Sequence, residues 1–179
     1  MNAAMARIQI IGGSGSGKTT LGRALAMRLS LPFVDLDDLY WEPGWREVGH
    51  DELKRRVAPI AAQADWVIAG NYGATAEMLL RPRLTTLVVL DLPYPTMMWR
   101  ILHRSLRRAV RREPCCNGNF ESLHRLLRHD APLRYLTRTW RRRHARYVTL
   151  ASEAGLSHAH VVRLTRQAEV DAWLAAQRA

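Results

Sequence analysis

Cysteine is scarce in this 179-residue chain, whose only two cysteines, Cys115 and Cys116, are adjacent. Neighbouring cysteines close no useful loop, so a disulfide framework is excluded, and free thiols favour a reducing compartment. No apolar run approaches the roughly 20 residues that a membrane-spanning helix needs. The N-terminal stretch also lacks the pattern of a signal peptide. We therefore expect a cytoplasmic protein without a membrane partner.

Acidic residues are few, and the imbalance of charge is local. Between Thr96 and Arg146 the chain has fourteen Arg and three acidic residues, which accounts for the whole net charge of +11. The rest of the chain is balanced. Positive charge concentrated in this way indicates a region that binds anions.

Apolar segments alternate with helical patterns along the chain. The patterns predict strands at 7–11, within 31–37, and at 65–72, 85–93 and 158–165. They predict helices over 18–30, 50–64, 94–112 and 132–152, near 119–130, and in the closing AEVDAWLAAQ segment. Such alternation implies an α/β fold in which helices cover both faces of a parallel sheet. We expect one domain over 1–179, with 96–157 as an Arg-rich helical lid or insertion.

A glycine-rich loop follows the first predicted strand and fits the pattern G-x-x-x-x-G-K-[ST]. The residues expected to bind the nucleotide here are Gly12, Gly13, Ser14, Gly15, Ser16, Gly17, Lys18, Thr19 and Thr20. Glycines let backbone amides converge on phosphate oxygens. Lys18 can reach the β- and γ-phosphates, and Thr19 can offer a hydroxyl to Mg²⁺. The loop therefore predicts ATP and Mg²⁺ as cofactors.

The loop alone does not identify the phosphate acceptor. GTPases need a base-specific N-K-x-D element, which the sequence lacks. Remodelling ATPases usually have longer chains and a second set of motifs. The chain length and the strand–helix alternation therefore favour a small kinase.

Five segments, taken in order, resemble a known family. They are GGSGSGKTTLGRALAMRL, DLDDLYWEPGW, DWVIAGNY, VVLDLPYPTMMWRILHR and VVRLTRQAEVDAWL. This succession is similar to the adenylate-kinase-related P-loop proteins of the topology-modulation (FlaR-type) family, over 7–112 and 158–175. The resemblance implies a three-layer P-loop nucleoside-kinase-like fold, a five-stranded parallel sheet of order 2-3-1-4-5 and a mobile lid. It implies no particular substrate.

The resemblance also implies catalytic roles. Asp37 stands where related kinases keep an acid after the second strand, and such a carboxylate can accept the acceptor's proton. Its neighbours Asp35 and Asp38 leave that assignment open. Arg100 and Arg104 resemble the arginines that lead into the lid of adenylate kinases, and their spacing puts them on one helical face. The predicted catalytic residues are Lys18, Asp37, Arg100 and Arg104.

Ala69 departs from the family pattern, in which an Asp at this point holds magnesium through water. Asp91, which ends the run LVVLD within the fourth predicted strand, is the obvious substitute, and Asp37 is an alternative. The predicted metal residues are therefore Thr19 and Asp91. In similar kinases the loop after the last strand lies beside the adenine ring, so Arg163 and Arg166 are expected to contact the nucleotide.

The acceptor site is predicted from aromatic and amide side chains. In adenylate kinases an Arg directly follows the corresponding segment and grips the monophosphate. No Arg directly follows the GNY segment here, so the resemblance disfavours a nucleoside monophosphate as acceptor. The residues expected to line the pocket are Asp35, Tyr40, Trp41, Trp45, Asn71 and Tyr72. Such a pocket suits a ring-bearing or hydroxylated small molecule, although tryptophans equally often belong to a core.

These features predict an ATP-dependent phosphotransferase that moves the γ-phosphate to an unidentified small acceptor. The alternative is a P-loop ATPase or nucleotide-binding regulator that associates with nucleic acid through the Arg-rich 96–146 segment. A monomer and a homodimer are both compatible with the sequence.

Overall fold

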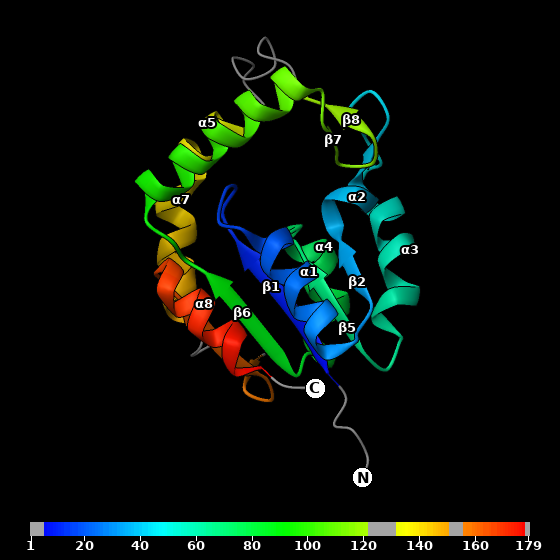
Figure 1. Ribbon diagram of the computed structural model, residues 1–179. Helices are drawn as coiled ribbons and strands as arrows, with labels where there is room; N and C mark the ends of the chain where they lie inside the picture. The colour runs from blue at the N-terminus through cyan, green and yellow to red at the C-terminus, as the bar shows by residue number, and fades with distance from the viewer. Residues whose placement is uncertain (1–5, 122–131, 151–155, 178–179) are drawn as a thin grey trace.

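The computed structural model describes residues 6–121, 132–150 and 156–177. Its centre is a sheet of five parallel strands (Figure 1). In chain order these are β1 (Arg7–Gly12), β2 (Phe33–Asp35), β5 (Trp66–Ala69), β6 (Thr86–Leu90) and β9 (His160–Leu164). Across the sheet they run β2-β5-β1-β6-β9. Numbered along the chain this is 2-3-1-4-5, so the predicted fold class is confirmed.

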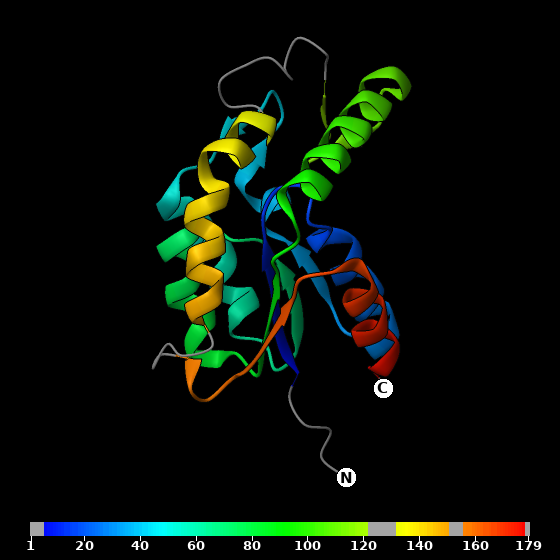
Figure 2. The ribbon, with the colours of Figure 1, turned by 90° about the vertical axis from the view of Figure 1, so that its left-hand side faces the viewer.

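Helices cover both faces of the sheet, as Figure 2 shows from the side. One face carries α1 (Lys18–Leu29) and α8 (Gln167–Ala176). The other carries α3 (His50–Ala61), α4 (Gly73–Leu80) and α7 (Pro132–Thr149), with the short helix η1 (Arg81–Arg83) after α4. All four residues of β5 are buried, as expected for a central parallel strand that is covered from both sides. The sheet therefore lies between two apolar cores.

The helix α5 (Tyr94–Arg111) leaves the carboxyl end of β6 and extends past the P-loop (Figure 1). Its buried face carries Met97 and Ile101, which pack with Leu136 of α7. Gly15 of the P-loop lies directly beneath, because a Cβ at that position would lie 2.5 Å from the Met97 carbonyl oxygen. The Arg-rich helices are therefore held next to the phosphate-binding loop.

Two short hairpins and a short helix were not predicted from the sequence. After β2 the chain forms α2 (Leu36–Tyr40) and the hairpin of β3 (Trp41–Glu42) and β4 (Arg46–Glu47). After α5 it forms the hairpin of β7 (Pro114–Cys115) and β8 (Asn119–Phe120). The helix expected near 119–130 is wrong at its start, since Asn119 pairs with Cys115, and 122–131 lie outside the described residues.

Among the described residues, no helix has the length and apolar character needed to cross a membrane.

Candidate active site

Within the described residues, a cavity of ≈ 1900 Å³ lies at the carboxyl ends of the strands. It is enclosed by the P-loop, α2, the β3–β4 hairpin, α5, the β7–β8 hairpin and α7. The predicted residues that line it are Gly12, Ser14, Gly15, Gly17, Lys18, Thr19, Thr20, Asp35, Asp37, Tyr40, Trp41, Trp45, Asn71, Tyr72 and Arg104. Six others, all within the described part of the chain, lie outside its lining: Gly13, Ser16, Asp91, Arg100, Arg163 and Arg166. The structure thus brings the predicted phosphate and acceptor residues together.

The P-loop is shaped by left-handed backbone. Gly15 and Gly17 have φ of 77° and 95°, which side chains other than glycine rarely tolerate, and α1 begins at once with Lys18. Its first amides and the positive end of its dipole favour an anion at this point. The Lys18 ammonium donates a hydrogen bond to the Gly13 carbonyl at 3.0 Å. Burial lowers the pKa of Lys18, while the charges of Asp37 and Asp35 oppose that shift. A half-buried cation beside loop amides is suited to bind phosphate.

Asn71 braces the P-loop. Its Oδ1 accepts a hydrogen bond from the Gly12 amide at 3.0 Å, and its Nδ2 donates to the Gly12 carbonyl at 2.6 Å. A longer bond of 3.4 Å leads from Nδ2 to the Tyr147 hydroxyl on α7. The sequence predicted Asn71 as an acceptor residue, whereas its amide group is used to hold the start of the loop. This role depends on the fold: Asn71 follows β5, and β5 pairs with β1, the strand that ends at Gly12.

An acidic pair faces the P-loop threonine. The Thr19 hydroxyl donates to Asp35 Oδ2 at 2.6 Å, and the Asp37 amide donates to Asp35 Oδ1 at 3.0 Å. Burial raises the pKa of Asp35, the charge of Asp37 raises it further, and the bond from Thr19 opposes both. Ala69 is the partner of Asp35 on the adjacent strand and is fully buried. The carboxylate next to Thr19 is therefore that of Asp35.

Asp91 has other partners. Its side chain is only 2% exposed and accepts from Arg163 Nε at 2.9 Å and Nη2 at 2.5 Å. The Nδ1 atom of His144, on α7, lies 2.9 Å from the same carboxylate. These contacts join β6, β9 and α7. They give no support to the magnesium role predicted for Asp91, and they explain why Arg163 does not reach the cavity.

The predicted lid arginines differ in their surroundings. Arg100 donates to the Ser16 carbonyl at 3.4 Å and to Gln167 of α8 at 2.7 Å. Arg104 lines the cavity, and its buried Nε has no hydrogen-bond partner among the described residues. Arg166 lies at the start of α8 with Glu169. Only Arg104 of these three is placed to meet a ligand in the cavity.

Helix α7 adds cavity residues that the sequence did not single out. Arg142, Arg143 and Tyr147 line the cavity, and Tyr147 is buried next to Asn71. Burial raises the pKa of Tyr147, and the Arg143 charge opposes that shift. Three consecutive arginines, Arg141 to Arg143, are typical of a solvent-exposed helix surface. Only the packing of α7 against the sheet shows that Arg142 and Arg143 border the cavity.

Aromatic rings form the wall beside Asp37. The ring centroids of Tyr40 lie 5.2 Å from Trp41 and 4.6 Å from Tyr72, and Trp41 lies 5.6 Å from Trp45. The Tyr72 hydroxyl donates to Asp37 Oδ1 at 2.6 Å, and burial raises the pKa of Tyr72. The Tyr40 hydroxyl donates to Glu47 at 2.7 Å. Burial, together with this bond, raises the pKa of Tyr40 to about 12. The rings therefore line the cavity with hydroxyl groups already oriented.

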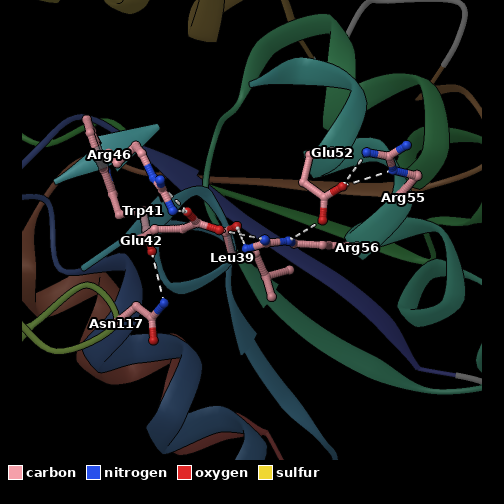
Figure 3. A network of polar contacts seen from close by, with 8 residues as sticks. All are labelled: Leu39, Trp41, Glu42, Arg46, Glu52, Arg55, Arg56 and Asn117. Atoms are coloured by element: carbon pink, nitrogen blue, oxygen red, sulfur yellow. Dashed lines mark hydrogen bonds and ion pairs between the residues drawn. The ribbon is translucent and has the colours of Figure 1, made fainter. Parts of the chain in front are cut away.

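A polar network fixes the outer side of this wall (Figure 3). Arg56 of α3 donates to Glu52 at 2.8 Å, to the Leu39 carbonyl at 3.0 Å and to Glu42 at 3.0 Å. Arg46 pairs with the same Glu42. The β3–β4 hairpin is thereby tied to α3.

The two hairpins meet over the cavity. The Asn119 side chain, only 3% exposed, accepts from the Trp45 amide at 2.8 Å and donates to the Glu42 carbonyl at 3.0 Å. Asn117 Nδ2 donates to the Trp41 carbonyl at 3.1 Å (Figure 3). We refer to these contacts of Asn117 and Asn119 with the β3–β4 hairpin as the clasp. The clasp joins the two hairpins beside Trp41 and Trp45, which are predicted acceptor residues.

The structure combines a parallel sheet of order 2-3-1-4-5, a P-loop and an acidic pair under an arginine-bearing helix. Together these features define a P-loop kinase, which is an ATP-dependent phosphotransferase. The family described as shikimate kinase matches residues 14–47. A shikimate kinase from Bacteroides thetaiotaomicron is 32% identical over 130 residues, which cover 64% of this chain and 70% of that protein. One from Bacteroides fragilis is 33% identical over 130 residues, covering 64% and 69%. The chain belongs to the shikimate kinase family.

Solved structures agree on the fold. Shikimate kinase from Bacteroides thetaiotaomicron has a TM-score of 0.56 at 20% identity and covers 96% of both chains. Shikimate kinase from Acinetobacter baumannii in complex with shikimate has a TM-score of 0.53 at 17% identity, covering 96% of this chain and 90% of that one. A gluconokinase from Sinorhizobium meliloti has a TM-score of 0.51 at 19% identity, covering 97% and 94%. The predicted kinase fold is confirmed.

The comparisons settle part of the family prediction. The P-loop kinase class and the phosphotransferase activity are confirmed. The topology-modulation family is not supported, and neither is the alternative of a nucleic-acid-associated regulator. The positive charge of the 96–146 segment is partly directed inward, since Arg104, Arg142 and Arg143 line the cavity.

Proposed function

We propose that this kinase transfers the γ-phosphoryl group of ATP to a hydroxyl group of a small hydroxylated carboxylic acid, with shikimate as the first acceptor to test. The names of the relatives support this choice. Shikimate and gluconate, the acceptor named for one structural neighbour, are both carboxylic acids that carry several hydroxyl groups. The observation that carries the proposal is that Lys18, Asp37 and Arg104 line one cavity.

Magnesium fits the residues beside the P-loop. Mg²⁺ prefers oxygen ligands and is usually held by one or two carboxylates together with substrate phosphates. Thr19 Oγ1 and Asp35 Oδ2, 2.6 Å apart, are such a set. No group of three or more His, Cys, Asp or Glu in the described ranges could hold a metal unaided. When bound with the nucleotide, the ion would neutralise charge on the β- and γ-phosphates.

Asp37 is the proposed general base. It accepts the proton of the acceptor hydroxyl as the oxygen forms its bond to the γ-phosphorus. The bond from the γ-phosphorus to the β–γ bridging oxygen breaks, and its electron pair leaves with ADP. The hydrogen bond from Tyr72 at 2.6 Å fixes one carboxylate oxygen, which orients the other toward the cavity.

Cations stabilise the charge that moves during transfer. Lys18 would lie against the β- and γ-phosphates, and Arg104 would contact the transferring group from the side of α5. The inward arginines of α7, Arg142 and Arg143, are then available to the acceptor carboxylate. Guanidinium groups suit this role because they bind carboxylates in a bidentate manner.

The test is release of ADP from ATP and Mg²⁺ with shikimate or gluconate as acceptor, with mass spectrometry of the phosphorylated product. Asp37→Asn should lower turnover with either acceptor by about 100-fold or more, while ATP affinity is kept. Asp51→Asn is the matched control, because Asp51 is an exposed Asp at the start of α3 that lies outside the cavity lining. Equal losses in the two variants would overturn the role of Asp37. Absence of acceptor-dependent ADP release would overturn the proposed acceptor class.

A further inference from the structure

The two cysteines of the chain lie together on the lid side of the cavity. Both Cys115 and Cys116 line it and are half-buried. Cys115 ends β7, and the turn that follows has left-handed backbone at Cys116 and Asn117, with φ of 43° and 60°. Since the chain has no other cysteine, any thiol chemistry of this protein takes place at this turn.

The two thiols are unequal. A hydrogen bond from the Cys116 thiol, helped by the charge of Arg108, lowers the pKa of Cys115. The same hydrogen bond, together with burial and the nearby charge of Asp37, raises the pKa of Cys116. A thiolate is the nucleophilic form of cysteine. Oxidation-sensitive cysteines are typically accessible, acidic and adjacent to a second thiol. Cys115 is partly exposed, has a lowered pKa and is followed directly by a second thiol.

The same turn holds the clasp. The Cys116 carbonyl accepts a hydrogen bond from Asn119 Nδ2 at 2.7 Å. The next residue, Asn117, donates from its amide to Asp38 at 3.2 Å and from its side chain to the Trp41 carbonyl. The backbone conformation at Cys116 therefore sets the positions of both clasp asparagines.

We infer that Cys115 and Cys116 are a peroxide-oxidation site that opens the clasp. The Cys115 thiolate attacks one oxygen of hydrogen peroxide, the O–O bond breaks, and a sulfenic acid forms as the departing hydroxide becomes water. The Cys116 sulfur then attacks the sulfenic sulfur. The S–O bond breaks, an S–S bond forms, and the second water leaves with the thiol proton. Two thiols thus lose two electrons and two protons to one peroxide.

Such a disulfide cannot form without moving the turn. Adjacent Cα atoms across a trans peptide are about 3.8 Å apart, whereas disulfides usually join Cα atoms about 4.4–6.8 Å apart. The peptide bond fixes the shorter distance, so the eight-membered disulfide ring closes only when the torsion angles on either side of that peptide turn to suit it, and the bonds of Asn117 and Asn119 to the β3–β4 hairpin change with them. Strained disulfides of this kind are the readily reducible ones, so the switch is reversible by thiols.

The effect on catalysis rests on the proposed function, because the clasp joins the two hairpins beside the predicted acceptor residues Trp41 and Trp45. Opening it should raise the KM for the acceptor at least about tenfold, equivalent to about 1.4 kcal/mol. ATP affinity should change little, since the P-loop is braced by Asn71 and not by the clasp.

The experiment compares the full-length protein before and after hydrogen peroxide, with dithiothreitol as reversal. Cys115→Ser and Cys116→Ser are the matched variants, and each rate is expressed relative to the same variant before treatment. Wild type should lose two hydrogen atoms by intact mass and lose activity at subsaturating acceptor, and dithiothreitol should restore both. Neither single variant should form an intramolecular disulfide. If wild type forms none, or forms it with unchanged acceptor KM, the inference is overturned.

A second readout needs no acceptor. Hydrogen exchange of the Trp45 amide, which donates to Asn119 in the clasp, should speed up on oxidation and slow again on reduction. If the exchange rate changes in this way but neither the oxidised nor the reduced protein phosphorylates an acceptor, the proposed acceptor class is refuted and the switch is supported. Unchanged exchange after disulfide formation would refute the switch, whatever the kinetics.

Discussion

Replacing Asn71 by Ala separates two interpretations of this residue. The sequence assigns it to the acceptor pocket, whereas the structure shows its amide group bonded to both backbone groups of Gly12. The two short bonds are each worth about 1–1.5 kcal/mol. The bond of 3.4 Å to Tyr147 adds little. Asn71→Ala should therefore lower the free energy of unfolding by about 2–3 kcal/mol.

The same change should weaken ATP binding. Without the two bonds from Asn71, the P-loop is less ordered before the nucleotide binds, so part of the binding free energy is used to order it. We expect the affinity for ATP to fall at least about tenfold. Urea denaturation measures the first effect and titration calorimetry the second. Tyr147→Phe is the control, since it removes the long contact to Asn71 and a contact with Arg143 but leaves both bonds between Asn71 and Gly12. It should change stability by less than about 1 kcal/mol. If Asn71→Ala leaves stability and ATP affinity unchanged and raises the KM for the acceptor, Asn71 does not hold the P-loop and belongs to the acceptor pocket.

Three further predictions concern charged residues around the P-loop. Arg104→Ala should slow single-turnover transfer by about 100-fold with ATP affinity retained, and unchanged transfer would remove Arg104 from the site. Asp91→Asn should leave magnesium-dependent nucleotide affinity unchanged and lower the free energy of unfolding by about 3 kcal/mol, because Arg163 and His144 lose a buried partner; a selective loss of magnesium dependence would revive the metal role. Because burial raises the pKa of Asp35, the folded state holds that proton more tightly than the unfolded state. Stability is thus lost as the pH rises from the ordinary range of an Asp through the raised value. Asp35→Asn should therefore make the nucleotide-free protein more stable than wild type at neutral pH, with a gap that narrows in acid, and a gap independent of pH in urea titrations would contradict this.

The sheet and the phosphate loop could be predicted from the sequence because their signals are local. The glycine pattern, the apolar strand before it and the Leu21–Leu25 spacing after it lie within a few residues of each other. Strand order followed from a resemblance carried by several motifs. Asp35 and Asp37 were also singled out, since Asp35 ends β2 and Asp37 lies two residues later, in α2.

The partners of polar side chains could not be predicted in the same way. Asp91 directly follows β6, which is next to the P-loop strand, and this position suggested a metal ligand. His144 and Arg163, which lie 53 and 72 residues away along the chain, contact its carboxylate instead. Asn119 appeared to belong to a helix, and its role in the clasp depends on a hairpin closed by left-handed residues. Such contacts are set by tertiary packing and leave no pattern along the chain.

In the proposed reaction the γ-phosphoryl group passes to a hydroxylated carboxylic acid bound beside Asp37. The most direct measurement follows γ-labelled ATP with magnesium and shikimate or gluconate, and compares label in the acceptor with ADP released. We expect one labelled acceptor for each ADP, and loss of both products in Lys18→Ala. Label that appears only as free phosphate, at a rate independent of either acid, would contradict it.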